Sequence, residues 1–130
     1  MLSSRTTVSG SIVRGAIVFL IAFAGFAYAQ KAPRTFIASP EIYKVAKRGD
    51  QCVMIEATWA SGQRDAFHSH ALGAIYWITS CKTRTFLPDG RSRDDAIRAG
   101  TYRVTEKPVL SHSEMNVGGS ECKAVLFERK

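Results

Sequence analysis

Three histidines are the residues of this sequence best suited to bind a metal ion. His68 and His70 stand one residue apart in the stretch RDAFHSHALGAIYWITS (residues 64–80), and His112 lies in a later stretch, VLSHSEM (109–115). Because alternate side chains of a β-strand share a face, His68 and His70 project together if this stretch is a strand. Neutral imidazoles on one face can bind one metal ion together. An H-x-H pair alone is weak evidence, but the chain has no histidine besides these three.

A site of three histidines defines a class of chemistry rather than a particular metal. Three imidazole ligands leave the other coordination positions to water, oxygen or a substrate. Imidazole suits Fe, Mn, Zn, Ni and Cu, so we expect a divalent transition metal whose identity stays open. The alternative is a relic site, in which the rings bind nothing and hydrogen bonds within the core satisfy their nitrogens.

The N-terminal 29 residues have the pattern of a signal peptide. Two arginines precede an apolar run, residues 16–27, and an Ala-x-Ala cleavage triplet ends at Ala29. The uncharged segment 15–29 is shorter than the roughly 20 residues that a membrane-spanning helix needs. We therefore expect cleavage between Ala29 and Gln30, and a periplasmic or secreted protein that does not stay in the membrane. The alternative is a retained N-terminal anchor.

The remaining chain, residues 30–130, has the size of one small domain. Loss of the leader removes two arginines and no acidic residue, which lowers the formal net charge from +7 to +5. The basic residues are scattered and form no stripe with stacking aromatic residues, which argues against nucleic-acid binding. The cluster RSRDDAIR (91–98) is expected to be a solvated hairpin, with anion recognition by Arg91 or Arg93 as the alternative.

The three cysteines, Cys52, Cys81 and Cys122, allow at most one internal disulfide and one remaining thiol in an exported chain. No C-x-x-C motif is present, so neither a redox motif nor a zinc knuckle is indicated.

Short β-strands dominate the expected secondary structure. Residues 30–38 are expected to be an extended linker, and Ser39 as N-cap, Pro40 at the first position and Gly49 as a stop predict a short helix or turn. Seven or eight short strands follow, a pattern typical of a β-sandwich or small barrel. The expected strand segments include 52–59, 66–70, 74–79, 83–86, 101–105, 109–115 and 122–128, and the clearest of them is 74–79.

These features resemble the cupin family of small double-stranded β-helix (jelly-roll) barrels. The first cupin motif is G-x5-H-x-H-x3,4-E-x6-G, and here Gly62 is followed by five residues and then by His68-Ser69-His70. The second motif ends in H-x3-N, which His112 and Asn116 match. The resemblance covers residues 39–130 and implies an all-β cupin domain there.

The metal motif is incomplete in this sequence. Its glutamate would fall at Ala74 or Ile75, neither of which can bind a metal. Glu114 is a candidate replacement, either as a fourth ligand or as the partner of a bound water, because it follows His112 at period two and should share its face. The alternative is a bulge after His112 that turns Glu114 outward.

The resemblance also implies roles for a tyrosine and for the cysteines. Tyr76 would share an inward face with Ala74 and could act as an acid or hydrogen-bond donor beside the metal, while simple packing in the core is the alternative. In the strand order of cupins, Cys81 and Cys122 meet and form the disulfide, which leaves Cys52 free.

The function implied by the resemblance is less specific than the fold. Cupins include dioxygenases, isomerases, decarboxylases, lyases and non-catalytic binding or storage proteins, and a fold does not choose among these. A small-molecule ligand or substrate is expected, and the leading hypothesis is a metal-dependent, dioxygenase-like enzyme. The alternatives are a non-catalytic periplasmic ligand-binding barrel with a degenerate metal site, and a structural module that forms a homodimer through its sheet.

Overall fold

The computed structural model of the protein describes residues 31–130, so the predicted signal peptide and its cleavage site lie outside the described residues. Within this range the chain forms nine strands and one short helix, which confirms the predicted all-β class. No helix in residues 31–130 has the length and hydropathy of a membrane-spanning segment.

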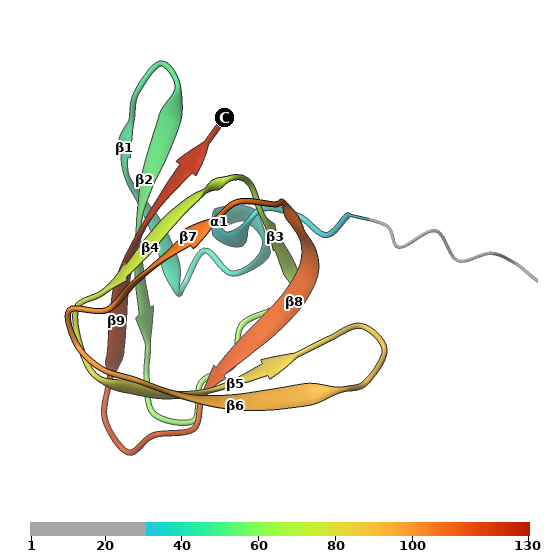
Figure 1. Cartoon of the computed structure of the whole chain (residues 1–130), viewed down its shortest axis with the longest axis vertical. Helices are drawn as coiled ribbons and strands as arrows, with labels where there is room; N and C mark the ends of the chain where they lie inside the picture. Colours follow the sequence, from blue (N-terminus) through green and yellow to red (C-terminus); the bar gives the residue numbers. More distant parts are fainter. Residues whose placement is uncertain (1–30) are drawn as a thin grey trace, which may run out of the picture.

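Two antiparallel sheets enclose a common interior (Figure 1). The five-stranded sheet has the order β1-β2-β9-β4-β7, and the four-stranded sheet has the order β3-β8-β5-β6. In Figure 1 the β5–β6 hairpin lies at the bottom of the barrel and β8 runs down its right side. The elements are α1 (Thr35–Ala38), β1 (Tyr43–Arg48), β2 (Cys52–Trp59), β3 (His68–His70), β4 (Gly73–Trp77), β5 (Cys81–Phe86), β6 (Ser92–Ile97), β7 (Tyr102–Thr105), β8 (Val109–Asn116) and β9 (Cys122–Arg129).

The core follows from the period-two pattern of the central strands. In β2 every second residue is buried, and β9 pairs with β2 along its whole length and alternates in the same way. The two inward rows therefore lie side by side, and burial of each large apolar side chain contributes about 1.5–3 kcal/mol. The buried apolar residues of these two rows are Val53, Ile55, Ala57, Trp59, Cys122, Ala124 and Leu126.

Strand β2 has the predicted bounds, but the segment before it differs from the prediction. Helix α1 lies at Thr35–Ala38, inside the expected linker, and Ser39 is its C-cap rather than the N-cap of a later helix. A turn follows Ser39, and residues 43–48 form strand β1. The strand prevails because Tyr43 becomes almost fully buried when β1 pairs with β2, and this burial outweighs the helix-capping signals.

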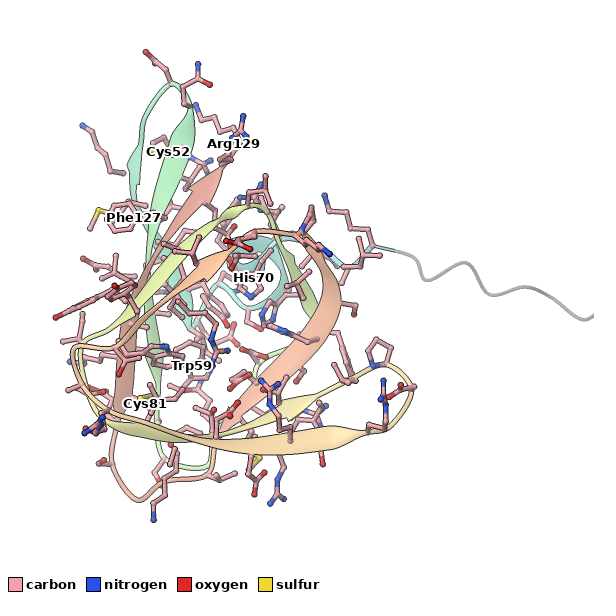
Figure 2. All side chains as sticks on the ribbon, viewed as in Figure 1. Cys52, Trp59, His70, Cys81, Phe127 and Arg129 are labelled. Atoms are coloured by element: carbon pink, nitrogen blue, oxygen red, sulfur yellow. A yellow bond between two sulfur atoms is a disulfide. The ribbon has the colours of Figure 1, made fainter. Side chains whose placement is uncertain are left out.

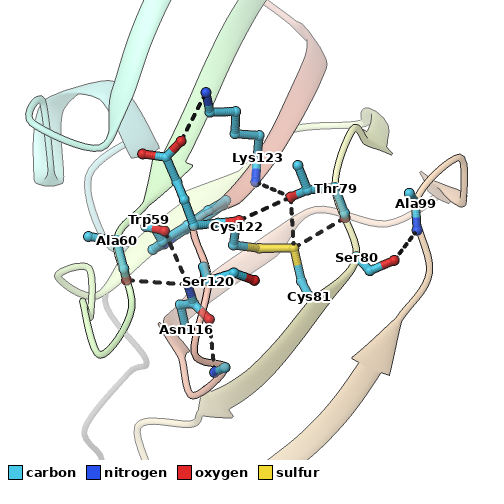
Figure 3. Close-up of a disulfide and its surroundings, with 12 residues drawn as sticks. Trp59, Ala60, Thr79, Ser80, Cys81, Ala99, Asn116, Ser120, Cys122 and Lys123 are labelled. Atoms are coloured by element: carbon cyan, nitrogen blue, oxygen red, sulfur yellow. Dashed lines mark hydrogen bonds and ion pairs between the residues drawn. A yellow bond between two sulfur atoms is a disulfide. The ribbon is translucent and has the colours of Figure 1, made fainter.

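A disulfide joins the two sheets at one end of the barrel (Figure 3). It connects Cys81, the first residue of β5, with Cys122, the first residue of β9, and the two Cα atoms are 5.4 Å apart. This is the pair that the cupin resemblance implied. Cys52 is free and exposed, and it lies toward the other end of the molecule (Figure 2).

Asn116, the last residue of the second cupin motif, holds two loops together next to the disulfide (Figure 3). Its amide nitrogen donates to the carbonyl oxygens of Trp59 at 3.1 Å, Ala60 at 3.3 Å and Ser120 at 2.8 Å. Its side-chain oxygen accepts a hydrogen bond from the backbone N–H of Gly118 at 2.9 Å. Asn116 therefore stabilises the loop that follows β2 and the loop that connects β8 to β9.

Removal of the disulfide should lower the stability of the protein without changing its fold. The bond joins residues 41 positions apart, and the chain-entropy model gives a stabilisation of about 4 kcal/mol for a loop of that length. In urea unfolding we expect the Cys81→Ala/Cys122→Ala variant to lose roughly 2–4 kcal/mol. Cys52→Ser is the control and should match the wild type, because Cys52 is exposed and unpaired. A loss in the Cys52 variant alone would contradict the pairing.

Candidate metal centre

The three histidines converge on one point inside the barrel. Strands β3 and β8 are antiparallel, with His68 opposite His112 and His70 opposite Val109, so β8 has one extra residue between the two pairs. The Nε2 atom of His70 lies 3.0 Å from that of His68 and 3.0 Å from that of His112. The Nε2 atoms of His68 and His112 are 2.9 Å apart. Figure 2 shows His70 pointing into the interior.

The backbone next to His68 determines how its ring is oriented. The Nδ1 atom of His68 lies 2.9 Å from the carbonyl oxygen of Ala66 and 3.4 Å from Oδ1 of Asp65. Both neighbours accept hydrogen bonds, so these contacts select the tautomer with the proton on Nδ1. The Nε2 lone pair of His68 is then directed at the other two rings.

A carboxylate orients His70 in the same way. The Nδ1 atom of His70 donates to Oε1 of Glu128 at 2.6 Å. The other oxygen of Glu128 accepts hydrogen bonds from Nε and Nη2 of Arg34 at 3.1 and 2.7 Å. Burial raises the pKa of Glu128, but the hydrogen bonds and charges of His70 and Arg34 outweigh burial, and the pKa is lowered overall. Glu128 therefore stays ionised and fixes the proton of His70 on Nδ1.

His112 remains neutral at pH values well below those at which a histidine ordinarily becomes protonated. Burial is the largest cause of a pKa lowered to about 3; a positive charge on His68, His70 or Arg93 acts in the same direction, and the charge of Asp65 opposes it. A metal competes with protons for the same lone pair. The folded site thus keeps the Nε2 atom of His112 available to a metal at neutral pH.

A transition metal fits these nitrogens better than hydrogen bonding does. A neutral imidazole has a single N–H, and His68 and His70 use theirs at Nδ1, so both of their Nε2 atoms are acceptors. Only one N–H, that of His112, is left for them. Nitrogen ligands about 2.1 Å from one ion and at right angles to each other lie about 3 Å apart. The observed separations of 2.9–3.0 Å match this spacing.

Asp65 is a buried carboxylate that connects the histidines to the core. Its Oδ2 accepts hydrogen bonds from the hydroxyl of Tyr43 at 2.7 Å and from the indole N–H of Trp59 at 3.1 Å. Its Oδ1 accepts the backbone N–H of Glu114 at 2.6 Å. Burial raises the pKa of Asp65, but the hydrogen bonds with His68, Glu114 and Tyr43 and the charge of His68 lower it overall. Asp65 therefore stays ionised beside His68.

Glu114 faces the interior, so the alternative that a bulge turns it outward is wrong. Its carboxylate accepts a hydrogen bond from the hydroxyl of Thr85 at 2.8 Å, and burial raises its pKa. Among residues 31–130, the group of possible ligand atoms within 4.8 Å of one another consists of His68, His70 and His112 alone. The structure therefore does not bring Glu114 into the ligand cluster, and its contact with a bound ligand stays a prediction.

Tyr76 lies on the outer face of the barrel, so its predicted place beside the metal is wrong. Ile75 and Trp77 are the inward residues of β4, whereas 46% of the surface of Tyr76 is exposed. The prediction that Ala74 and Tyr76 face inward was one residue out of phase. Trp77 decides the phase, because its ring stacks on Trp59 in the core with centroids 5.9 Å apart. Ile75, an apolar residue, thus has the inward position that the motif glutamate would occupy.

A cavity of about 560 Å³ adjoins the histidines between the two sheets. His70, His112 and Glu114 contribute to its wall. Most of the remaining wall is apolar and includes Tyr43, Trp59, Ile75, Trp77, Leu87 and Leu126. This volume and composition are typical of sites for small organic molecules.

Sequence analysis missed Asp65, Glu128 and Arg34, which position the ring nitrogens. Glu128 had a detectable signal, because it continues the inward row of β9, where a charged residue needs a buried partner. Asp65 and Arg34 lie outside the strands, and no local pattern indicates that they reach the interior.

Comparison with known proteins identifies the fold. No protein-family model and no curated protein matches the sequence. A cupin-domain protein from Bordetella pertussis Tohama I has a TM-score of 0.62 at 19% identity, over 78% of this chain and 98% of that one. A Klebsiella pneumoniae protein with a double-stranded β-helix domain has a TM-score of 0.54 at 20% identity, over 68% and 75% of the two chains. An RmlC-like cupin from Methanocaldococcus jannaschii has a TM-score of 0.53 at 9% identity, over 68% and 78%. The fold is therefore the predicted cupin jelly roll.

Loss of the carboxylate behind His70 should weaken metal binding. We expect Glu128→Gln to lower the metal affinity by about 10–100-fold, because the Nδ1 atom of His70 loses its ionised partner. Titration of the chelator-treated protein with Zn²⁺ and Mn²⁺ measures the effect. Glu114→Gln is the control, since it makes the same carboxyl-to-amide change in the same cavity and the carboxyl group of Glu114 contacts Thr85 and not a histidine. A larger loss in Glu114→Gln than in Glu128→Gln would instead place Glu114 at the metal.

Acid should destabilise the metal-free protein through His112. The pKa of His112 is about 3 in the folded state against an ordinary 6.5, so the unfolded state binds more protons between these values. The contribution of His112 to the free energy of unfolding is therefore fully present above about pH 6.5. It falls as the pH decreases, by up to about 1.4 kcal/mol per pH unit. Urea unfolding with chelator at several pH values measures this slope. His112→Asn should show a shallower slope, and identical slopes would mean that His112 is not held neutral.

Proposed function

We propose that this protein binds a divalent transition metal through His68, His70 and His112 and acts on a small organic molecule in the adjoining cavity. One observation supports this most strongly: three Nε2 atoms lie within 3.0 Å of one another beside a cavity of about 560 Å³. Within this class we propose a dioxygenase-like oxidoreductase. The metal is one of Fe, Mn, Zn, Ni or Cu, since imidazole suits all five.

The residues of the chain would bind the metal, orient the ligand and exclude water. A metal bound to the three imidazoles would supply Lewis acidity toward an oxygen atom of the ligand. Glu128 and the carbonyl of Ala66 hold the rings of His70 and His68 in the orientation for binding. The apolar wall excludes water, which strengthens electrostatic interactions inside the cavity. Glu114 lines the same cavity and offers a carboxyl group to a ligand.

A non-catalytic ligand-binding barrel is the second candidate, and Ile75 is the observation that favours it. This apolar side chain occupies the inward position of β4, where the cupin motif would have an acidic metal ligand. Without that carboxylate, the three histidines supply only neutral ligands. A binding protein needs no more than that, whereas an enzyme must obtain any further ligand from the substrate or from water.

We also propose that the protein is exported to the periplasm or secreted. The Ala-x-Ala triplet that ends at Ala29 supports this, and so does the Cys81–Cys122 disulfide, because disulfides persist mainly in oxidising compartments. The N-terminal sequence of the exported protein, expected to begin at Gln30, is the direct check.

Metal content and oxygen uptake test the proposed function. We expect the wild type to bind one metal per chain and His70→Ala to bind it at least about tenfold more weakly, because one of three ligands is lost. Tyr76→Phe is the control and should match the wild type, since Tyr76 lies on the outer face. Titration with each of the five metals, followed by mass spectrometry of the native protein, measures binding.

The same samples separate the two candidates. Oxygen uptake with a panel of small organic acids and phenols should require both the metal and His70 if the protein is an enzyme. Bound metal without uptake for any compound would favour the binding barrel. A wild type that binds none of the five metals would contradict the metal centre and the proposed enzyme.

A further inference from the structure

Arg103 is a cation on the inner face of the barrel mouth. In the register of the five-stranded sheet it lies opposite Ile75, which in turn lies opposite Leu126. Residues opposite each other in antiparallel strands share a face, and Leu126 and Ile75 belong to the core. Arg103 therefore belongs to the inward row of edge strand β7, and its side chain lines the same cavity as His70 and His112.

Arg103 differs from the other arginines at the mouth because it has no acidic partner. Arg91 pairs with Asp89 at 2.7 Å, and Arg93 pairs with Asp95 at 3.0 Å. Within residues 31–130, the side chain of Arg103 forms neither an ion pair nor a hydrogen bond. The two paired arginines are neutralised locally, so among the described arginines of the cavity wall Arg103 alone has a positive charge without an acidic partner.

We propose that Arg103 recognises the carboxylate of a small organic acid whose apolar body lies in the cavity. This inference rests on the proposed function, since it specifies the substrate class of the same site. A guanidinium group matches a carboxylate with two parallel hydrogen bonds. The apolar wall, which includes Trp59, Trp77 and Leu126, suits the remainder of such a molecule.

Charge balance favours a carboxylate over a phosphate. One uncompensated cation matches the single negative charge of a monocarboxylate, whereas a phosphate ester at neutral pH has up to two. The opposing interpretation is that Arg103 only prevents edge-to-edge association of β7, as charged residues on edge strands often do.

Paired charged and neutral ligands test this proposal. The probes are benzoate and benzyl alcohol, which share a ring and differ in the carboxylate, and binding is followed by the fluorescence of Trp59 and Trp77 in the cavity wall. The wild type should bind benzoate at least about tenfold more tightly than benzyl alcohol, since charge-assisted hydrogen bonds are the strong ones. Arg103→Gln should abolish this preference while its affinity for benzyl alcohol stays the same.

Arg98→Gln is the matched control, because it removes the same charge. Arg98 is exposed and lies outside the wall of this cavity. It should keep the preference for benzoate. Equal preference in Arg103→Gln and the wild type, or no preference in the wild type, overturns the proposal. Inorganic phosphate that displaces benzoate at equal concentration also overturns it, because the site would then be a general anion site.

Metal content, measured on each sample, separates this inference from the proposed function. A metal-loaded wild type with no preference for benzoate overturns the carboxylate site alone and leaves the metal centre standing. A preference that depends on Arg103 in a protein that binds none of the five metals supports the carboxylate site and contradicts the metal centre.

Discussion

The Nε2 atoms of three imidazoles lie within 3.0 Å of one another, and all three must be unprotonated if they are to bind one ion. The rest of the site meets that requirement. A proton shared among buried, closely packed rings is unfavourable, and burial together with the neighbouring rings lowers the pKa of His112 to about 3. The proton acceptors at Nδ1, Ala66 for His68 and Glu128 for His70, turn the remaining lone pairs toward one point. A cation satisfies such lone pairs better than the single N–H left to them.

The residues that enforce this constraint come from distant parts of the chain. Strands β3 and β8 supply the imidazole rings, and β9 supplies Glu128. Asp65 lies in the segment before β3, and Arg34 is the residue that precedes α1. Asp65 links the site to the core through Tyr43 and Trp59. The disulfide fixes the ends of β5 and β9 to each other, so the strand that presents Glu128 is anchored at its opposite end. The cupin fold therefore acts as the scaffold that brings these carboxylates to the imidazoles.

The sequence predicted what local periodicity determines, and it missed what tertiary contacts determine. Strand β2 was predicted correctly because its alternation is regular over eight residues. Strand β1 was missed because helix-capping residues precede it, and only pairing with β2 shows that Tyr43 is buried. Tyr76 was assigned to the wrong face because β4 is apolar on both faces, so the packing of Trp77 on Trp59 decides the phase. The partners of the ring nitrogens, 58 residues from His70 in the case of Glu128, follow from no local pattern.

Anomalous X-ray diffraction from crystals of the protein grown with Mn²⁺ or Zn²⁺, recorded on both sides of the metal's absorption edge, tests the central claim most directly. The account predicts one anomalous peak per chain, about 2.1 Å from the Nε2 atoms of His68, His70 and His112. It also predicts that Nδ1 of His70 remains hydrogen-bonded to Glu128, as it is in the structure. A metal bound elsewhere, or clear density for three histidines without a peak between them at saturating metal, would contradict the account.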